Sequence, residues 1–119
     1  MAFKFEELKV WQKSLDFSYE IHKLTLSLPK EEIFILNSQI KRAADSITLN
    51  IAEGSTGQSN KEFSRFIGIT LRSAIEVVCC LYIGQKRAII TESKFHELYL
   101  EAETIIKMLQ SLRNVLKKQ

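Results

Sequence analysis

Apolar residues recur along the last quarter of the chain at alternating spacings of three and four. The stripe consists of Phe95, Leu98, Ala102, Ile105, Leu109, Leu112 and Leu116. This heptad spacing turns one apolar face of a helix toward partner helices. Thr91 is a suitable N-cap, and Glu92 lies in the first turn, where the helix dipole favours an anion. The pattern therefore predicts a helix over about 92–117.

The beginning of the chain carries a similar stripe. It contains Val10, Phe17, Ile21, Leu24 and Leu28, and Ser14 fills the heptad position between Val10 and Phe17. Pro29 ends the pattern, because the residue before a proline avoids helical geometry. We expect a first helix over about 7–27.

The next segment pairs an apolar stripe with a polar one. Its apolar positions are Ile33, Leu36, Ile40, Ala43, Ile47 and Ile51, which predict a helix over about 31–53. Gly54 is expected in the left-handed position that follows a helix. The polar stripe lies beside the apolar stripe instead of opposite it, which is unusual for a solvated face. It comprises Gln39, Arg42, Ser46, Asn50 and Glu53.

The third helical segment, about 60–86, is apolar on almost every side. Ser59 and Glu62 form a predicted capping box at its start. Between residues 66 and 83 the charged residues are Arg72 and Glu76, which are spaced as an i, i+4 pair. A helix that is apolar nearly all round must be buried nearly all round. We therefore expect copies of the chain to cover this helix in a homo-oligomer, although scattered exposed apolar residues are the alternative.

Four long helices with short connections predict an all-α, up-and-down antiparallel four-helix bundle, formed as one domain over 1–119. The composition agrees, since the 119 residues are 45% hydrophobic and 26% charged, with one proline and four glycines. The charged N-terminal segment is unlike a signal peptide, and no uncharged apolar run reaches the ~18 residues of a membrane span. We expect a cytoplasmic protein with no membrane partner.

Residue spacing does not point to catalysis or to a cofactor. Cys79 and Cys80 are adjacent and are interpreted as two core thiols of a reducing compartment. His22 and His96 lack the acidic partners of a di-iron bundle and are interpreted as surface residues. Neither a phosphate-binding glycine loop nor a nucleophile elbow is present in the sequence. The expectation is a protein that is not an enzyme and holds no metal or cofactor.

The basic residues are the remaining feature of the sequence that indicates a function. The formal net charge is +3, which permits nucleic-acid binding without requiring it. In a ring of subunits a modest basic patch would repeat and its field would add. The candidate nucleic-acid-binding residues are Lys9, Lys13, Lys41, Arg42, Lys61, Arg65, Lys86 and Arg87. An ordinary solvated surface, with acidic residues interleaved, remains the alternative from the residues alone.

Several segments resemble one protein family. Residues 36–47 (LNSQIKRAADSI) and 50–54 (NIAEG) are similar to the signature of the four-helix 23S rRNA intervening-sequence proteins. Weaker likenesses cover residues 5–14, 28–32 and 59–63, together with Arg72 and Glu76. Thr48-Leu49 stand where the family often has a proline, and Arg72 stands where it usually has a glycine.

The resemblance implies a bundle that assembles as a ring, typically a pentamer. A related branch comprises accessory variability determinant proteins of diversity-generating retroelements, which implies RNA or DNA, a reverse transcriptase or another protein as partners. The positions that carry the family motif are Gln39, Arg42, Ser46, Asn50, Glu53, Arg72 and Glu76. We expect them to be structural, hydrogen-bonding between helices or subunits. A homo-oligomeric nucleic-acid-binding bundle is the leading hypothesis, and a protein-binding scaffold without a nucleic-acid role is the alternative.

Overall fold

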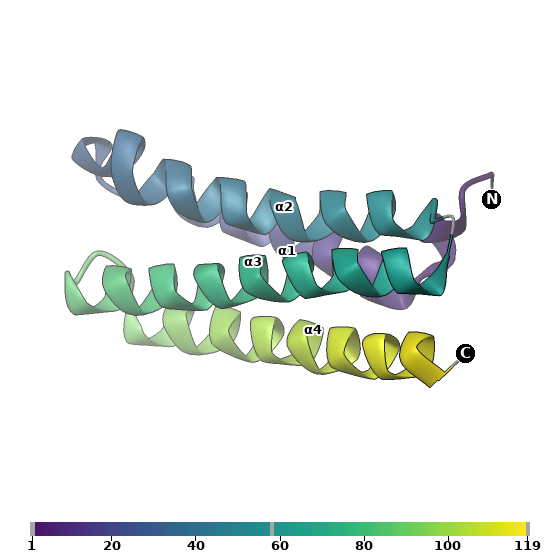
Figure 1. The fold of residues 1–119 in the computed structure, drawn as a ribbon. Coiled ribbons are helices and arrows are strands. Elements are labelled where there is room, and N and C mark those ends of the chain that lie inside the picture. Colours follow the sequence, from purple (N-terminus) through teal and green to yellow (C-terminus); the bar gives the residue numbers. More distant parts are fainter. Residues whose placement is uncertain (1, 58, 119) are drawn as a thin grey trace.

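The apolar stripes fold into four long helices in a computed structural model, which describes residues 2–57 and 59–118 (Figure 1). The helices are α1 (Lys9–Leu26), α2 (Ser38–Ser55), α3 (Asn60–Lys86) and α4 (Glu92–Lys118). They run alternately up and down, and the described residues contain no strand. The expected all-α, up-and-down four-helix bundle is confirmed. It measures 45 × 23 × 21 Å, so that its length is close to the ~40 Å of a 27-residue helix.

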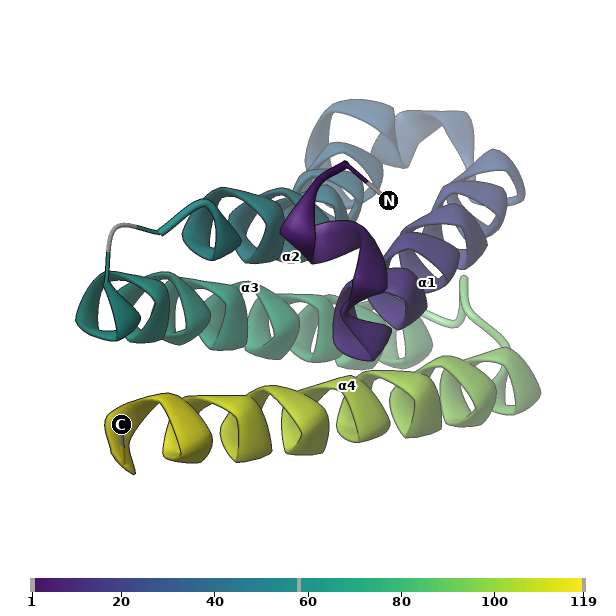
Figure 2. The ribbon, with the colours of Figure 1, turned by 90° about the vertical axis from the view of Figure 1, so that its right-hand side faces the viewer.

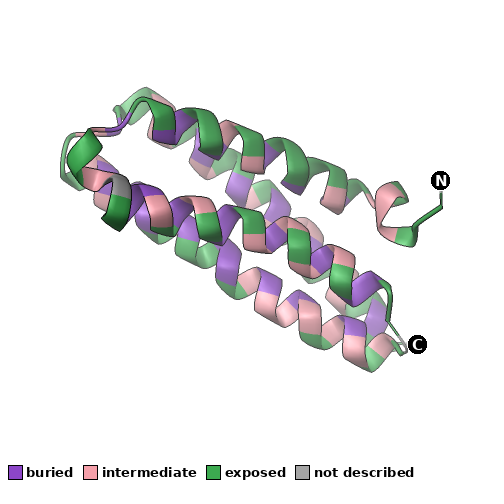
Figure 3. Ribbon diagram, turned by 90° about the horizontal axis from the view of Figure 1, so that it is seen from above, coloured by how far each residue is buried: buried purple, intermediate pink, exposed green. Residues whose placement is uncertain are grey.

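The core is built from the predicted heptad positions. Buried residues form stripes that face the inside of the bundle (Figure 3). The largest side chains with less than 2% exposure include Ile21, Ile40, Ile47, Ile51, Ile67, Leu81, Leu98 and Leu109. All four helices contribute to this core, so the periodicity identified the inner face of each one correctly.

Helix α3 is the centre of the packing. It packs extensively against both α2 and α4, whereas α1 and α4 meet less closely. A short 3₁₀ turn, η1 (Lys4–Glu7), precedes α1 and contacts both α1 and α2 (Figure 2). The antiparallel order brings the start of α3 beside the end of α4, at the end of the bundle where both termini lie (Figure 1).

The connection between α1 and α2 departs from the predicted helix boundary. The segment was expected to be α-helical from about residue 31, but it forms a 3₁₀ turn, η2 (Lys30–Glu32), and a π-helical turn, η3 (Ile33–Asn37). The π turn leaves Leu36 and Asn37 facing the core, where the Asn37 side-chain amide donates to the Thr25 carbonyl at 3.4 Å. The regular α-helix begins at Ser38, directly after this turn. The side chain of Ile33, expected in the apolar stripe, lies outside the described residues.

The expected left-handed glycine after α2 is also wrong. Gly54 lies inside α2, and no described glycine has a positive φ. Its role is close approach, because a Cβ on Gly54 would lie 2.6 Å from the Phe66 Cβ and 3.0 Å from the Phe63 Cδ1. Glycine therefore allows the end of α2 to pack directly against α3.

Replacing Gly54 by alanine is expected to destabilise the protein by about 1–3 kcal/mol, because the Phe66 Cβ is fixed to the backbone of α3 and cannot give way cheaply. Gly68→Ala is the matched control. A Cβ on Gly68 would meet Arg113 Nη1 at an ordinary 3.7 Å. Alanine there should stabilise α3 by about 0.5–1 kcal/mol. Urea denaturation of both variants checks the prediction, and equal effects of the two substitutions would contradict it.

Helix α3 has a composition that could cross a membrane. An 18-residue window within Asn60–Lys86 has a mean hydropathy of 1.8. Arg72 and Glu76 interrupt this helix, so it contains no uncharged apolar run of ~18 residues. The core helix of a bundle meets the same criterion, and 39% of this window is buried inside the structure. Its packing against α2 and α4 accounts for its apolar character on two sides.

Candidate nucleic-acid interface

Part of the polar stripe of α2 meets α3 and forms a polar seam with it. The polar seam comprises Gln39, Ser46, Asn50, Ser73 and Glu76. The Ser46 and Ser73 hydroxyl oxygens are 2.9 Å apart, and the Asn50 amide donates to the carbonyl and hydroxyl oxygens of Ser46, each at 2.8 Å. At the exposed end of the seam, Gln39 Nε2 donates to Glu76 Oε2 at 3.3 Å. The Ser46–Ser73 and Gln39–Glu76 bonds join the two helices and favour one register of α2 against α3, whereas the Asn50 bonds lie within α2.

The other motif residues do not cross between helices. Arg42 Nη2 donates to Ser38 Oγ at 3.2 Å within α2, and Glu53 and Arg72 are exposed. The sequence spacing predicted an ion pair between Arg72 and Glu76, but none forms among the described residues. Glu76 instead accepts the hydrogen bond from Gln39 of α2, across the seam.

The predicted basic residues fall into two groups at opposite ends of the bundle. The group near the termini lies at the starts of α1 and α3 and comprises Lys9, Lys13, Lys61 and Arg65. The other group lies at the start of α2 and the end of α3 and comprises Lys41, Arg42, Lys86 and Arg87. The second group is partly neutralised, since Arg87 Nη1 lies 3.2 Å from Glu32 Oε1. One continuous patch is therefore not formed within a single subunit.

Two further cations join Lys61 and Arg65. The antiparallel pairing of α3 and α4 brings Arg113 and Lys117 beside the first turns of α3, and all four line one surface groove. The sequence pattern explained Arg113 and Lys117 only as favourable charges at the C-terminal end of a helix. The signal that could have found them is the topology, because an up-and-down bundle must place the end of its fourth helix beside the start of its third.

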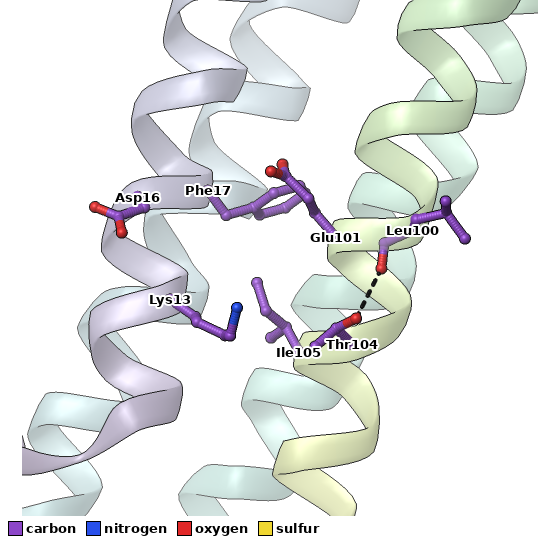
Figure 4. A pocket seen from close by; sticks show the side chains of 7 residues that line it. All are labelled: Lys13, Asp16, Phe17, Leu100, Glu101, Thr104 and Ile105. Carbon is purple, nitrogen blue, oxygen red and sulfur yellow. Dashed lines mark hydrogen bonds between the residues drawn. The ribbon is translucent and has the colours of Figure 1, made fainter.

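Lys13 borders a separate cleft between α1 and α4. Figure 4 shows its amine directed toward the gap, opposite the carboxyl group of Glu101, while Asp16 points away. The cleft has a volume of about 280 Å³. Burial raises the pKa of Glu101, and Glu20 and Glu97 raise it further. The one hydrogen bond drawn there, from Thr104 Oγ1 to the Leu100 carbonyl at 3.1 Å, lies within α4.

Neither a metal site nor a reactive thiol pair is found in the part of the chain that the structure describes. No group of three or more His, Cys, Asp or Glu residues there could hold a metal ion. The expectation of two core thiols is wrong for one of them, because Cys80 is buried whereas Cys79 is exposed. Consecutive helical residues point about 100° apart, so both side chains could not face the core.

The two thiols are expected to react differently in the free subunit. Burial raises the pKa of Cys80 to about 11, so this thiol stays protonated near pH 8, and the thiolate is the reactive form. At low protein concentration iodoacetamide should therefore modify Cys79 and leave Cys80 intact, as read by peptide mass spectrometry. Unfolded protein should react at both positions. Equal labelling of both thiols in the folded protein would contradict the assigned burial.

The fold and the polar seam define the class of protein. It is an all-α, up-and-down four-helix bundle in which hydrogen bonds join the second and third helices and cations lie at both ends. Within this class, the sequence matches the family model of the 23S rRNA-intervening sequence protein over residues 6–111. The chain belongs to this family, and the resemblance noted in the sequence is confirmed.

One solved structure extends the comparison to three dimensions. It is the crystal structure of a protein with unknown function from the S23 ribosomal protein family of Bacteroides thetaiotaomicron VPI-5482. The two chains share 30% sequence identity and a TM-score of 0.83, over 88% of this chain and 95% of the other. No protein with a curated description matches the sequence.

Proposed function

We propose that the protein is a non-catalytic, cytoplasmic homo-oligomer, a pentameric ring, that binds RNA or DNA through basic patches repeated around the ring. Membership of the 23S rRNA-intervening sequence protein family supports a role connected with nucleic acid. The formal net charge of +3 supports the same partner, since each subunit added to a ring adds to the field that attracts phosphates.

The observation that carries the proposal is the apolar surface left on α3. Ile75 is 58% exposed and Tyr82 is 53% exposed, and Cys79 lies between them on the same face. Leu49 on neighbouring α2 is 60% exposed. Exposed apolar side chains gathered on one face of a helix are typical of an interaction surface. Other copies of the same chain are always available as partners. An assembly with closed symmetry would cover this face of α3 in every subunit.

Binding measured against salt tests the nucleic-acid role. Titration of a labelled 20-nucleotide RNA, and of DNA of the same sequence, should give an affinity that falls steeply between about 50 and 200 mM salt. Steep dependence supports counterion release by several Lys and Arg contacts. Absence of binding at 50 mM salt, or an affinity independent of salt, would rule out the nucleic-acid role.

A protein-binding scaffold is the second candidate, and one surface favours it. The last residue of α1 and the connection to α2 expose apolar side chains at the end of the bundle away from the termini, namely Leu26 (74%), Phe34 (93%) and Ile35 (60%). Such a cluster suits a protein partner, and a reverse transcriptase is one candidate by family resemblance. Phe34→Ser should abolish capture of such a partner in a nuclease-treated pull-down, whereas the same substitution should leave RNA binding unchanged if the first proposal holds.

A further inference from the structure

The groove between the start of α3 and the end of α4, called here the α3–α4 groove, concentrates the positive charge of the chain. It has a volume of about 430 Å³ and is lined by Ser59, Lys61, Glu62, Ser64, Arg65, Gly68, Arg113 and Lys117. Four cations and one carboxylate give a surplus of three positive charges. This surplus equals the formal net charge of the whole chain, +3, so the remaining surface is balanced.

One wall of the groove is internally neutralised by an ion pair within α3. Arg65 Nη2 donates to Glu62 Oε1 at 2.7 Å and Arg65 Nε donates to Glu62 Oε2 at 3.3 Å. The Arg65 guanidinium also lies 4.8 Å from the centre of the Phe66 ring. The hydrogen bond from Arg65 lowers the pKa of Glu62, so this carboxylate is ionised at neutral pH and is paired with Arg65. Glu62 therefore compensates Arg65 and not the other three cations.

Lys61, Arg113 and Lys117 have no ion-pair partner within the described part of the chain. Lys61 lies in the first turn of α3, where the helix dipole disfavours a cation. Arg113 lies over Gly68, with its Nη1 3.7 Å from where a Cβ would be, so the missing side chain leaves the floor open. A second hollow of about 280 Å³, lined by Asn60, Lys61, Ser64, Leu116 and Lys117, continues the groove along the same edge.

The lining also limits what the groove can recognise. It contains charged groups, the hydroxyls of Ser59 and Ser64 and a glycine, but no aromatic ring on which a base could stack. Cations and hydroxyls are the side chains that contact phosphate oxygens and position a nucleic acid without reading its sequence. Two adjoining basic hollows that share Lys61, Ser64 and Lys117 suit a chain of phosphates better than a single small anion.

We propose that the α3–α4 groove binds the phosphodiester backbone of a single nucleic-acid strand, with Lys61, Arg113 and Lys117 as the phosphate-contacting residues. The inference rests on the proposed nucleic-acid function and names its site. Binding there is independent of base sequence. In an assembly each subunit contributes one such groove, so a long strand engages several at once.

The test compares four proteins in titrations of a labelled mixed-sequence 20-nucleotide RNA over a range of salt. They are the native chain, a groove variant (Lys61→Gln, Arg113→Gln, Lys117→Gln), a charge-retaining variant (Lys61→Arg, Arg113→Lys, Lys117→Arg) and a matched control. The control carries Lys23→Gln, Lys30→Gln and Lys107→Gln, three exposed cations outside the groove. Circular dichroism verifies the fold, and the single groove substitutions are titrated as well in case the triple variant unfolds.

The groove variant should bind at least ~10-fold more weakly at low salt, and its log–log salt slope should be shallower by about 2, since each phosphate contact on a single strand contributes about 0.7. The charge-retaining variant and the control should stay within about twofold of the native chain. Native-like binding by the groove variant, or equal weakening of groove variant and control, would overturn the groove and leave the nucleic-acid role standing. No binding by the native chain would overturn both.

Discussion

Replacing Ile75 by aspartate is expected to reduce the assembled protein to free subunits of 13.7 kDa without unfolding them. Ile75 is 58% exposed in the single subunit, so the bundle itself tolerates a carboxylate there. In the proposed assembly a second copy covers the same position. Burying an unpaired carboxylate costs several kcal/mol, and even ~3 kcal/mol lowers an association constant about 100-fold. Light scattering after size-exclusion chromatography measures the change.

Leu100→Asp is the matched control for this substitution. Leu100 is 45% exposed on α4, where it lines the cleft between α1 and α4, so its aspartate variant should retain the native mass. Iodoacetamide labelling gives a second readout, because Cys79 should react faster in the Ile75→Asp variant than in the assembled native protein. An Ile75→Asp protein with the native mass and native Cys79 reactivity would show that this face is not the contact between copies.

Replacing Leu81 by alanine is expected to cost about 2–5 kcal/mol of folding free energy. Leu81 is 0% exposed in the middle of the core, so truncation leaves a cavity in addition to losing apolar contact. The loss is a large share of the ~5–15 kcal/mol that stabilises a domain of ordinary size. Urea denaturation at one fixed protein concentration measures it, because the proposed assembly would make apparent stability depend on concentration.

Leu100, which is 45% exposed on α4, again provides the control. Leu100→Ala removes the same atoms from a half-exposed site and introduces a better helix former, so a change within about 0.5 kcal/mol is expected. Similar losses for Leu81→Ala and Leu100→Ala would mean that Leu81 is not the core residue that the structure places there.

The long helices could be predicted from sequence because their signals are local and periodic. The heptad stripe from Phe95 to Leu116 defined α4, and Thr91 caps it as predicted, with Thr91 Oγ1 accepting from the Lys94 amide at 3.1 Å. The expected start of α3 was also correct, since Ser59 Oγ accepts from the Glu62 amide at 3.0 Å. The Glu62 side chain did not complete the capping box, because Arg65 one turn later offered a charged partner.

Features set by contacts between helices could not be predicted in this way. Gly54 matched a helix-ending pattern, but its packing against Phe66 depends on how closely α2 approaches α3. The π turn before α2 reflects the burial of Leu36 and Asn37 against the end of α1. Likewise Lys61 and Arg113 lie about fifty residues apart in the sequence, and only the antiparallel pairing of their helices makes them neighbours.

The polar seam lies between these two cases. Its α2 members stood out in the sequence because a polar stripe beside an apolar one is unusual. Their partners on α3 could not be inferred, since Ser73 and Glu76 become neighbours of Ser46 and Gln39 only in one register of the two helices. The sequence therefore marked the surface of α2 that meets α3 but not the hydrogen bonds across it.

Sedimentation equilibrium of the native protein over a dilution series tests the central claim most directly, since the exposed apolar face of α3 is proposed to be covered by other copies of the chain. The account predicts a single species whose mass is a multiple of 13.7 kDa, five-fold for the proposed ring, at micromolar concentration. A well-folded species of 13.7 kDa throughout the series would contradict it.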